Sequence, residues 1–175
     1  MFDAKVMQTN PGWDEKLLKQ LPHLADKQIA VGFPKGKEDL SQPHPGYDGD
    51  MSIIDVAAAN EFGTDRQPRR PFLHQSRSPL EDMFKQAQES LAESAKKAIE
   101  SGQIRKANLA PALNKIALMA EYVVKDTITN GDYRENAAET IKRKQKGKKG
   151  VETRPLIDSG DMRKYVTGVV RTSGR

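Results

Sequence analysis

Residues 109–127, LAPALNKIALMAEYVVKDT, carry the pattern that decides the fold. Apolar residues recur there in alternating steps of four and three, which is the period of one face of an α-helix. The resulting seam consists of Leu109, Leu113, Ile116, Ala120 and Val123, and it continues to Thr127. Because this seam is narrow and rich in alanine, it predicts packing against one neighbouring element, in the same chain or in another subunit.

A second long helix is predicted upstream, between Ser78 and Gly102. Its start is indicated by Ser78, Pro79 and Glu81. Serine can accept a bond from a free backbone N–H, proline suits the first helical position, and Glu81 can complete a capping box. The apolar stripe that follows consists of Leu80, Phe84, Ala87, Leu91 and Ala98.

Shorter elements surround these helices. Residues 28–33 and 165–170 are predicted strands, and residues 13–21 and 52–62 are predicted short helices. A further short helix is expected near the C-terminal end, capped by Asp158. Gly131 is expected to end the helix that carries the seam, and Gly63 is expected to end the helix at residues 52–62. The order of elements predicts an α+β fold, with long helices packed on a small, mainly antiparallel sheet. We expect a single domain over residues 1–175, with mobile loops near residues 34–50 and 142–154.

Composition argues against most kinds of chemistry. The chain has no cysteine, which excludes a disulfide framework, a thiolate zinc site and a cysteine nucleophile. Its three histidines are scattered, and no phosphate loop, nucleophile elbow or calcium-loop spacing is present. We therefore expect no enzyme activity, no cofactor and no metal. No apolar run is long enough to span a bilayer and no signal peptide is visible, which favours a soluble cytoplasmic protein without a membrane partner.

The connector at residues 60–73, NEFGTDRQPRRPFL, allows two interpretations. It is either an ordinary loop anchored to its own core by Phe72, which the residue types alone favour, or an arm that docks on another subunit or on phosphates. The candidate arm consists of Arg66, Pro68, Arg69, Arg70, Pro71, Phe72 and Leu73.

A second basic stretch follows the long helices. Its candidate contact residues are Lys142, Arg143, Lys144, Lys146, Lys148 and Lys149. No aromatic residue is interleaved, so the stretch lacks the stacking platform that single-stranded nucleic acid requires. A solvated loop is the first interpretation, and non-specific contact with duplex DNA or an acidic neighbour is the alternative.

Three blocks of the chain, taken in order, resemble a known family. They are IAVGFP at residues 29–34, VAAANEFGT with PRRPFL at residues 56–73, and PLIDSGDM at residues 155–162. In order and spacing they are similar to the tail-completion and neck proteins of long-tailed phages, the virion morphogenesis group of lambda Z-like and Mu G-like proteins. Gln67 and His74 depart from that pattern, where an aliphatic residue and an arginine are usual.

The resemblance implies a structural virion protein without catalytic residues. Such a subunit forms a ring at the neck or head-proximal tail end, completing the tail and joining it to the head. The implied partners are further copies in a cyclic ring, the head-completion or adaptor protein and the tail terminator. The basic loop adds the expectation of a non-specific contact with duplex DNA in the lumen. Two alternatives stay open: an assembly factor absent from the mature particle, and a DNA-binding module that uses the basic loop. If the arm binds a partner, Phe72→Ala or Arg70→Glu blocks assembly and leaves the subunit folded.

Overall fold

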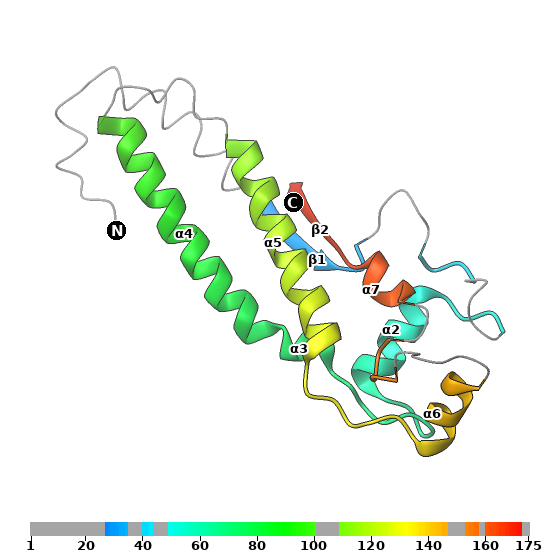
Figure 1. Ribbon diagram of the computed structural model, residues 1–175. Coiled ribbons are helices and arrows are strands. Elements are labelled where there is room, and N and C mark those ends of the chain that lie inside the picture. Colours follow the sequence, from blue (N-terminus) through cyan, green and yellow to red (C-terminus); the bar gives the residue numbers. More distant parts are fainter. Residues whose placement is uncertain are drawn as a thin grey trace.

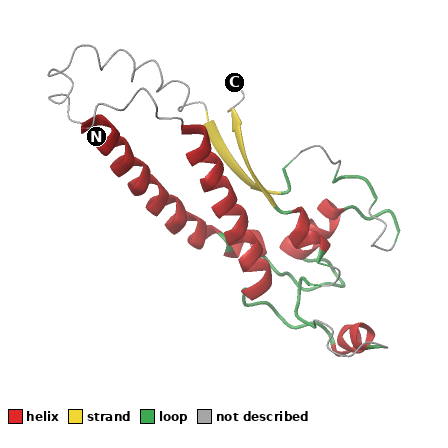
Figure 2. Ribbon diagram, turned by 45° about the horizontal axis from the view of Figure 1, so that its top comes forward, coloured by secondary structure: helices red, strands yellow, loops and turns green. Residues whose placement is uncertain are grey.

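The computed structural model describes residues 27–34, 40–43, 49–100, 109–146, 153–157 and 160–172. Within these ranges the fold is α+β, as the sequence predicts (Figures 1 and 2). The elements are β1 (Lys27–Gly32), α2 (Ile53–Phe62), α3 (Phe72–Gln75), α4 (Arg77–Glu100), α5 (Leu109–Asn130), α6 (Ala138–Gln145), α7 (Asp161–Tyr165) and β2 (Thr167–Thr172). The helix predicted at residues 13–21 and most of the loop predicted at 34–50 lie outside the described residues.

Helix α5 lies at the centre of the fold, between α4 on one side and the strands on the other (Figure 1). Ile116 and Ala120 of the predicted seam are buried against Met83 of α4, and Val123 packs beside them. A single neighbour was predicted for this helix, and that prediction was wrong. A second buried stripe consists of Ala117, Val124 and Ile128. It faces the sheet and the core cluster that contains Phe72 and Met162. Leu113 is half-buried, and the side chain of Leu109 is outside the described residues.

The sheet has two antiparallel strands, with Lys27 opposite Thr172 and Gly32 opposite Thr167. The second strand begins two residues later than predicted because α7 continues to Tyr165. Helix α5 approaches β2 very closely at Gly168, where a Cβ atom would lie 2.0 Å from the carbonyl oxygen of Ala117. Only glycine permits that approach. The Gly168 N–H donates to Glu121 Oε2 at 3.0 Å, which ties the strand to the helix.

Gly168→Ala is expected to lower the free energy of unfolding by about 1–3 kcal/mol, because the added methyl group overlaps backbone that cannot yield. Urea denaturation followed by circular dichroism measures the loss. Thr167→Ala, one residue away and exposed, is the matched control and should change stability by no more than about 0.5 kcal/mol. Equal midpoints for the two variants would contradict the close packing of β2 on α5.

The start of α4 differs from the prediction. The helix begins at Arg77, directly after α3 and Ser76, so Ser78 and Pro79 lie within its first turn. Ser76 is buried and its Oγ donates to the Phe72 carbonyl oxygen at 2.6 Å. Glu81 pairs with Arg77 at 2.9 Å instead of completing a capping box at Ser78. The predicted cap was therefore wrong, because the chain before Ser78 is already helical.

Helix α2 begins and ends as predicted. Ser52 is its N-cap, and a complete capping box joins it to Asp55. Hydrogen bonds from the side chain and backbone of Ser52 lower the pKa of Asp55. Gly63 ends the helix in the left-handed region, at φ 78°, where glycine is favoured.

One core cluster joins segments that are far apart in the sequence. Its buried members are Ala57, Phe72, Val124, Ile128, Met162 and Val166, and Val31, Phe33 and Leu156 pack against them. The rings of Phe33 and Phe72 meet edge to face, with centroids 6.2 Å apart. The core therefore holds the ends of α2, α5 and α7 and the start of α3 in one unit with β1.

Candidate interaction surfaces

The connector between α2 and α3 folds back on its own chain. Thr64 and Gln67 close a tight turn, with the Thr64 N–H donating to the Gln67 carbonyl oxygen at 2.9 Å. The Arg70 N–H then donates to the Asn60 carbonyl oxygen at 2.7 Å, and Arg69 Nε donates to the Glu61 carbonyl oxygen at 3.0 Å. The connector is thus bonded along its length to the last turn of α2.

Glu61 is the residue that joins α2 to α3, and sequence reasoning missed it. Its side chain is buried, and its two carboxylate oxygens accept from the backbone N–H groups of Leu73 at 2.8 Å and His74 at 3.1 Å. These N–H groups belong to the first turn of α3, where a helix lacks internal acceptors and favours negative charge. No local spacing signals this contact, because the partners are twelve and thirteen residues apart.

Glu61→Ala is expected to destabilise the fold by about 1–3 kcal/mol, because two part-buried backbone donors lose a charged acceptor. Thermal unfolding of the purified chain measures the effect. Glu81→Ala is the control, since Glu81 is an exposed carboxylate in an i,i+4 pair and such pairs contribute about 0.3–0.5 kcal/mol. Similar losses for both variants would contradict the bridging role of Glu61.

Two residues of the candidate arm are internal anchors. Phe72 is fully buried, and Arg70 is only 6% exposed. Arg70 donates to the carbonyl oxygens of Arg134 and Glu135 at 3.1 and 3.4 Å, and to Asn136 Oδ1 at 2.9 Å. Burial lowers the pKa of its guanidinium group. The prediction that these two side chains face a partner is therefore corrected, and the interpretation of the connector as a loop anchored by Phe72 is confirmed.

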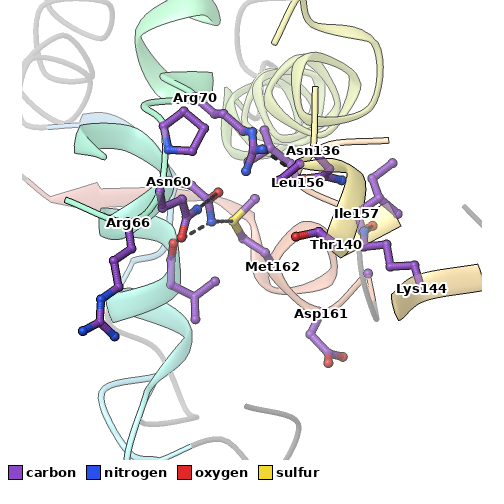
Figure 3. Close-up of a pocket in the computed structure, with 15 residues that line it drawn as sticks. Asn60, Arg66, Arg70, Asn136, Thr140, Lys144, Leu156, Ile157, Asp161 and Met162 are labelled. Atoms are coloured by element: carbon purple, nitrogen blue, oxygen red, sulfur yellow. Dashed lines mark hydrogen bonds between the residues drawn. The ribbon is translucent and has the colours of Figure 1, made fainter. Parts of the chain in front are cut away.

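The other members of the arm differ in exposure. Arg66, Arg69 and Leu73 are exposed, whereas Pro68 and Pro71 are half-buried. Arg66 and Pro68 border a polar cavity of about 330 Å³ between the connector, α2, α6 and α7 (Figure 3). Asn60, on the cavity wall, donates to the Val56 carbonyl oxygen at 2.8 Å and accepts from Gln67 at 2.6 Å. Both the nitrogen and the oxygen of the Asn60 amide are therefore hydrogen-bonded within the subunit.

The basic stretch is only partly a loop. Lys142, Arg143 and Lys144 lie in the last two turns of α6, which corrects the loop predicted from residue 142. Lys144 Nζ donates to the carbonyl oxygen of Ile157, so this ammonium group holds α6 against the segment before α7. Lys142 and Lys146 are exposed. Lys148, Lys149 and the side chain of Arg143 lie outside the described residues.

The cap predicted for α7 was also wrong. The N-cap residue of this helix is Gly160, in the left-handed conformation, and among the described residues no side chain makes a cap hydrogen bond to it. Asp158 lies outside the described residues. Leu156, from the same block, packs against the core.

Helix α2 exposes an apolar face. Its inner face buries Ile53, Ala57, Asn60 and Glu61, yet the opposite side also carries apolar residues. Ala58 is exposed there, Met51 and Ile54 are partly exposed, and the Phe62 side chain is 75% exposed. Apolar residues on the side of a helix that faces away from its own core indicate a second contact there. The outer face of α2 therefore has the composition of a contact surface.

A second apolar surface lies on α5, on the side away from the sheet. Leu118 and Tyr122 are 62% and 69% exposed, and Met119 lies beside them. Together with Met83, Lys115 and Val123 they line a shallow depression of about 290 Å³ between α4 and α5. Large exposed apolar residues that gather in this way mark interaction sites more often than isolated ones do.

Neither of these two surfaces faces the core. Ala57 of α2 and Val124 of α5 face the same core cluster. In a helix of 3.6 residues per turn, Phe62 lies about 140° around from Ala57, and Tyr122 lies about 160° around from Val124. The outer face of α2 and the depression beside α5 thus each point away from the core that the two helices share.

Within the described ranges, no group of three or more histidine, aspartate or glutamate residues is placed to hold a metal ion. None of the helices in that part of the chain is long and apolar enough to cross a membrane. Comparison with protein-family models, with curated proteins and with solved structures finds no match to this chain.

Proposed function

We propose that this protein is a structural subunit of a tailed-phage particle, located at the neck or the head-proximal end of the tail. It assembles with further copies of itself into a ring that completes the tail and joins it to the head. The observation that carries this proposal is the outer face of α2, where Ile54, Ala58 and Phe62 present an apolar surface to solvent. A permanent subunit gains stability by covering such a surface with a neighbour.

The packing of the three blocks that resemble the neck and tail-completion family supports the proposal. Val31 and Phe33 come from the first block, Ala57 and Phe72 from the second, and Met162 from the third. All five belong to one core cluster or pack against it. Blocks separated by more than a hundred residues thus serve one structural unit, which gives a physical reason for their occurring together.

The DNA-binding alternative receives less support. Lys144, in the middle of the basic stretch, donates to the backbone near α7, so its charge is already used within the subunit. The exposed Lys142 and Lys146 lie in a chain whose net charge is only +5. Non-specific affinity for duplex DNA grows with the number of phosphates neutralised, and a mild net charge gives a weak general attraction to them.

The copy number of this protein in purified virions tests the proposal. Quantitative mass spectrometry, with the portal protein as internal standard, is expected to give a number equal to that of the portal protein or half of it, because rings on one symmetry axis have related copy numbers. Absence from mature particles would overturn the proposal in favour of an assembly factor. A copy number many times that of the portal would place the protein elsewhere in the particle.

A further inference from the structure

We infer that the outer face of α2 of one copy packs into the depression beside α5 of the next copy, with Phe62 seated against Tyr122, Leu118 and Met83. This inference rests on the proposed function, in that it names the contact by which the subunit assembles. The partner is a second copy of this chain, and the contact is head-to-tail, because it joins two different surfaces.

The two surfaces match in chemistry. Phe62 is a large, rigid side chain that projects from the end of α2. The depression is lined almost entirely by apolar atoms, and two of its members, Met83 and Met119, have flexible thioether side chains. Methionine adapts to an aromatic ring and makes favourable sulfur–aromatic contacts. Tyr122 adds a ring that can meet Phe62 edge to face.

The two surfaces also match in spacing. Residues 55, 58, 59 and 62 of α2 are Asp, Ala, Ala and Phe, at positions i, i+3, i+4 and i+7. Residues 115, 118, 119 and 122 of α5 are Lys, Leu, Met and Tyr, at the same four positions. Such positions form one row on a helix, about 10.5 Å long. Laid parallel, the two rows place carboxylate against ammonium, small side chains against large ones, and one ring against the other.

Charge fixes the direction of this packing. Asp55 and Lys115 are exposed, and each lies two turns before the aromatic residue of its row. In the parallel arrangement Asp55 meets Lys115, whereas the antiparallel arrangement places each charge against a ring of the other row. Opposite charges at the edge of an apolar contact select the correct register and partner.

The position of the surfaces determines the kind of assembly. Because they are different patches, one on α2 and one beside α5, a head-to-tail contact between two copies leaves one patch of each copy open to a further copy. Each copy receives one neighbour at each patch, which is the arrangement that generates a ring if the rotation closes. Each contact is small, so closure of the ring, which makes the last contact intramolecular, adds much of the stability.

Cysteine cross-linking tests the contact, and the natural chain has no cysteine to interfere. Phe62→Cys and Tyr122→Cys are made as separate full-length variants, mixed and treated with a short bis-maleimide reagent. The expected result is a covalent dimer in the mixture, at a yield at least about tenfold above that of either variant alone, because only the head-to-tail contact places the two thiols side by side. Maleimide labelling of Phe62→Cys is expected to be fast in dilute monomer and slow in the assembled state.

A charge variant tests the register. Lys115→Glu is expected to reduce the yield of the mixed dimer roughly tenfold, because it sets a second carboxylate against Asp55. Lys85→Glu makes the same change of charge at an exposed position of α4 outside the depression, and it should leave the yield unchanged. Equal effects of the two variants would overturn the predicted register.

Several results would overturn the inference itself. Dominant dimers of Phe62→Cys with itself would show a symmetric contact, and slow labelling in the monomer would show that the chain's own residues cover α2. A cross-link from Phe62→Cys to an added virion protein, in place of the mixed dimer, would assign the face to that protein. A mixture that yields no dimer at all would exclude the contact. The copy number in virions is a separate measurement. A ring copy number without the mixed dimer leaves the proposed function standing and removes this contact, whereas absence from virions removes the proposed function.

Discussion

Phe72→Ala is expected to lower the free energy of unfolding by about 3–5 kcal/mol, the loss typical of a large aromatic side chain deleted from a core. Phe72 is fully buried among Ala57, Val124, Ile128 and Met162, and its ring contacts that of Phe33. The cavity left behind borders four separate elements, which cannot all collapse into it. The variant should therefore lose much of its helical circular dichroism at urea concentrations that leave the natural protein folded.

Leu73→Ala is the matched control for this experiment. It is the next residue on the same short helix, but it is 37% exposed whereas Phe72 is fully buried, so the expected change is within about 1 kcal/mol. If Phe72→Ala kept its stability and failed only to assemble, the core position of this ring would be contradicted. The partner-arm interpretation of the connector would then regain support.

The long helices and the fold class could be predicted from the sequence because both depend on local periodicity. The prediction for α5 was incomplete for a physical reason. A seam of alternating steps identifies one packing face, but Val124 and Ile128 form a second face against other elements. Deciding between one neighbour and two requires knowing where the sheet and α2 lie. Periodicity along a single helix does not contain that information.

Helix starts were predictable only where the preceding chain was irregular. Either Ser52 or Asp50 could cap α2 by its sequence, and Ser52 does so, because the residues before it form no helix in the described part of the chain. Ser78 fits the same rule, yet it lies inside α4, because α3 and Ser76 already hold the chain in a helical path. The prediction of a helix cap uses only a few adjacent residues. It fails when a tertiary contact, here the buried Phe72, starts the helix earlier.

The candidate surfaces, too, could be predicted from the sequence only in part. The bonds of Glu61 and Arg70 could not be read from the sequence, because their partners lie 12 to 66 positions away. The exposed face of α2 did have a signal. Ile54 and Phe62 fall outside the buried face of this helix, and apolar residues outside the buried face indicate a second contact. The same reasoning applies to Leu118 and Tyr122 of α5.

Arg70→Glu is expected to be as destabilising as the loss of Phe72, at about 3–5 kcal/mol, because it buries a charge without a partner. Arg70 Nε and Nη2 donate to three oxygen acceptors of residues 134–136, and these bonds hold the chain after α5 against the connector. A carboxylate offers no donor to these oxygens and repels them. The connector and the α5–α6 segment should separate together, which hydrogen exchange at residues 132–137 would detect.

Two comparisons make this prediction specific. Arg66→Glu makes the same change of charge at an exposed position of the same connector, so its stability should stay within about 0.5 kcal/mol of the natural protein. The Arg70→Glu variant should also recover part of its stability at low pH. Burial raises the folded pKa of the introduced carboxyl above its unfolded value of about 4.3, so stability is present below that value and is lost as the pH rises through the folded pKa. A loss of stability independent of pH, or equal losses at positions 66 and 70, would contradict the role of Arg70 as a buried donor. The connector would then be free to act as an arm, and the assembly contact would have to be sought there instead of on α2.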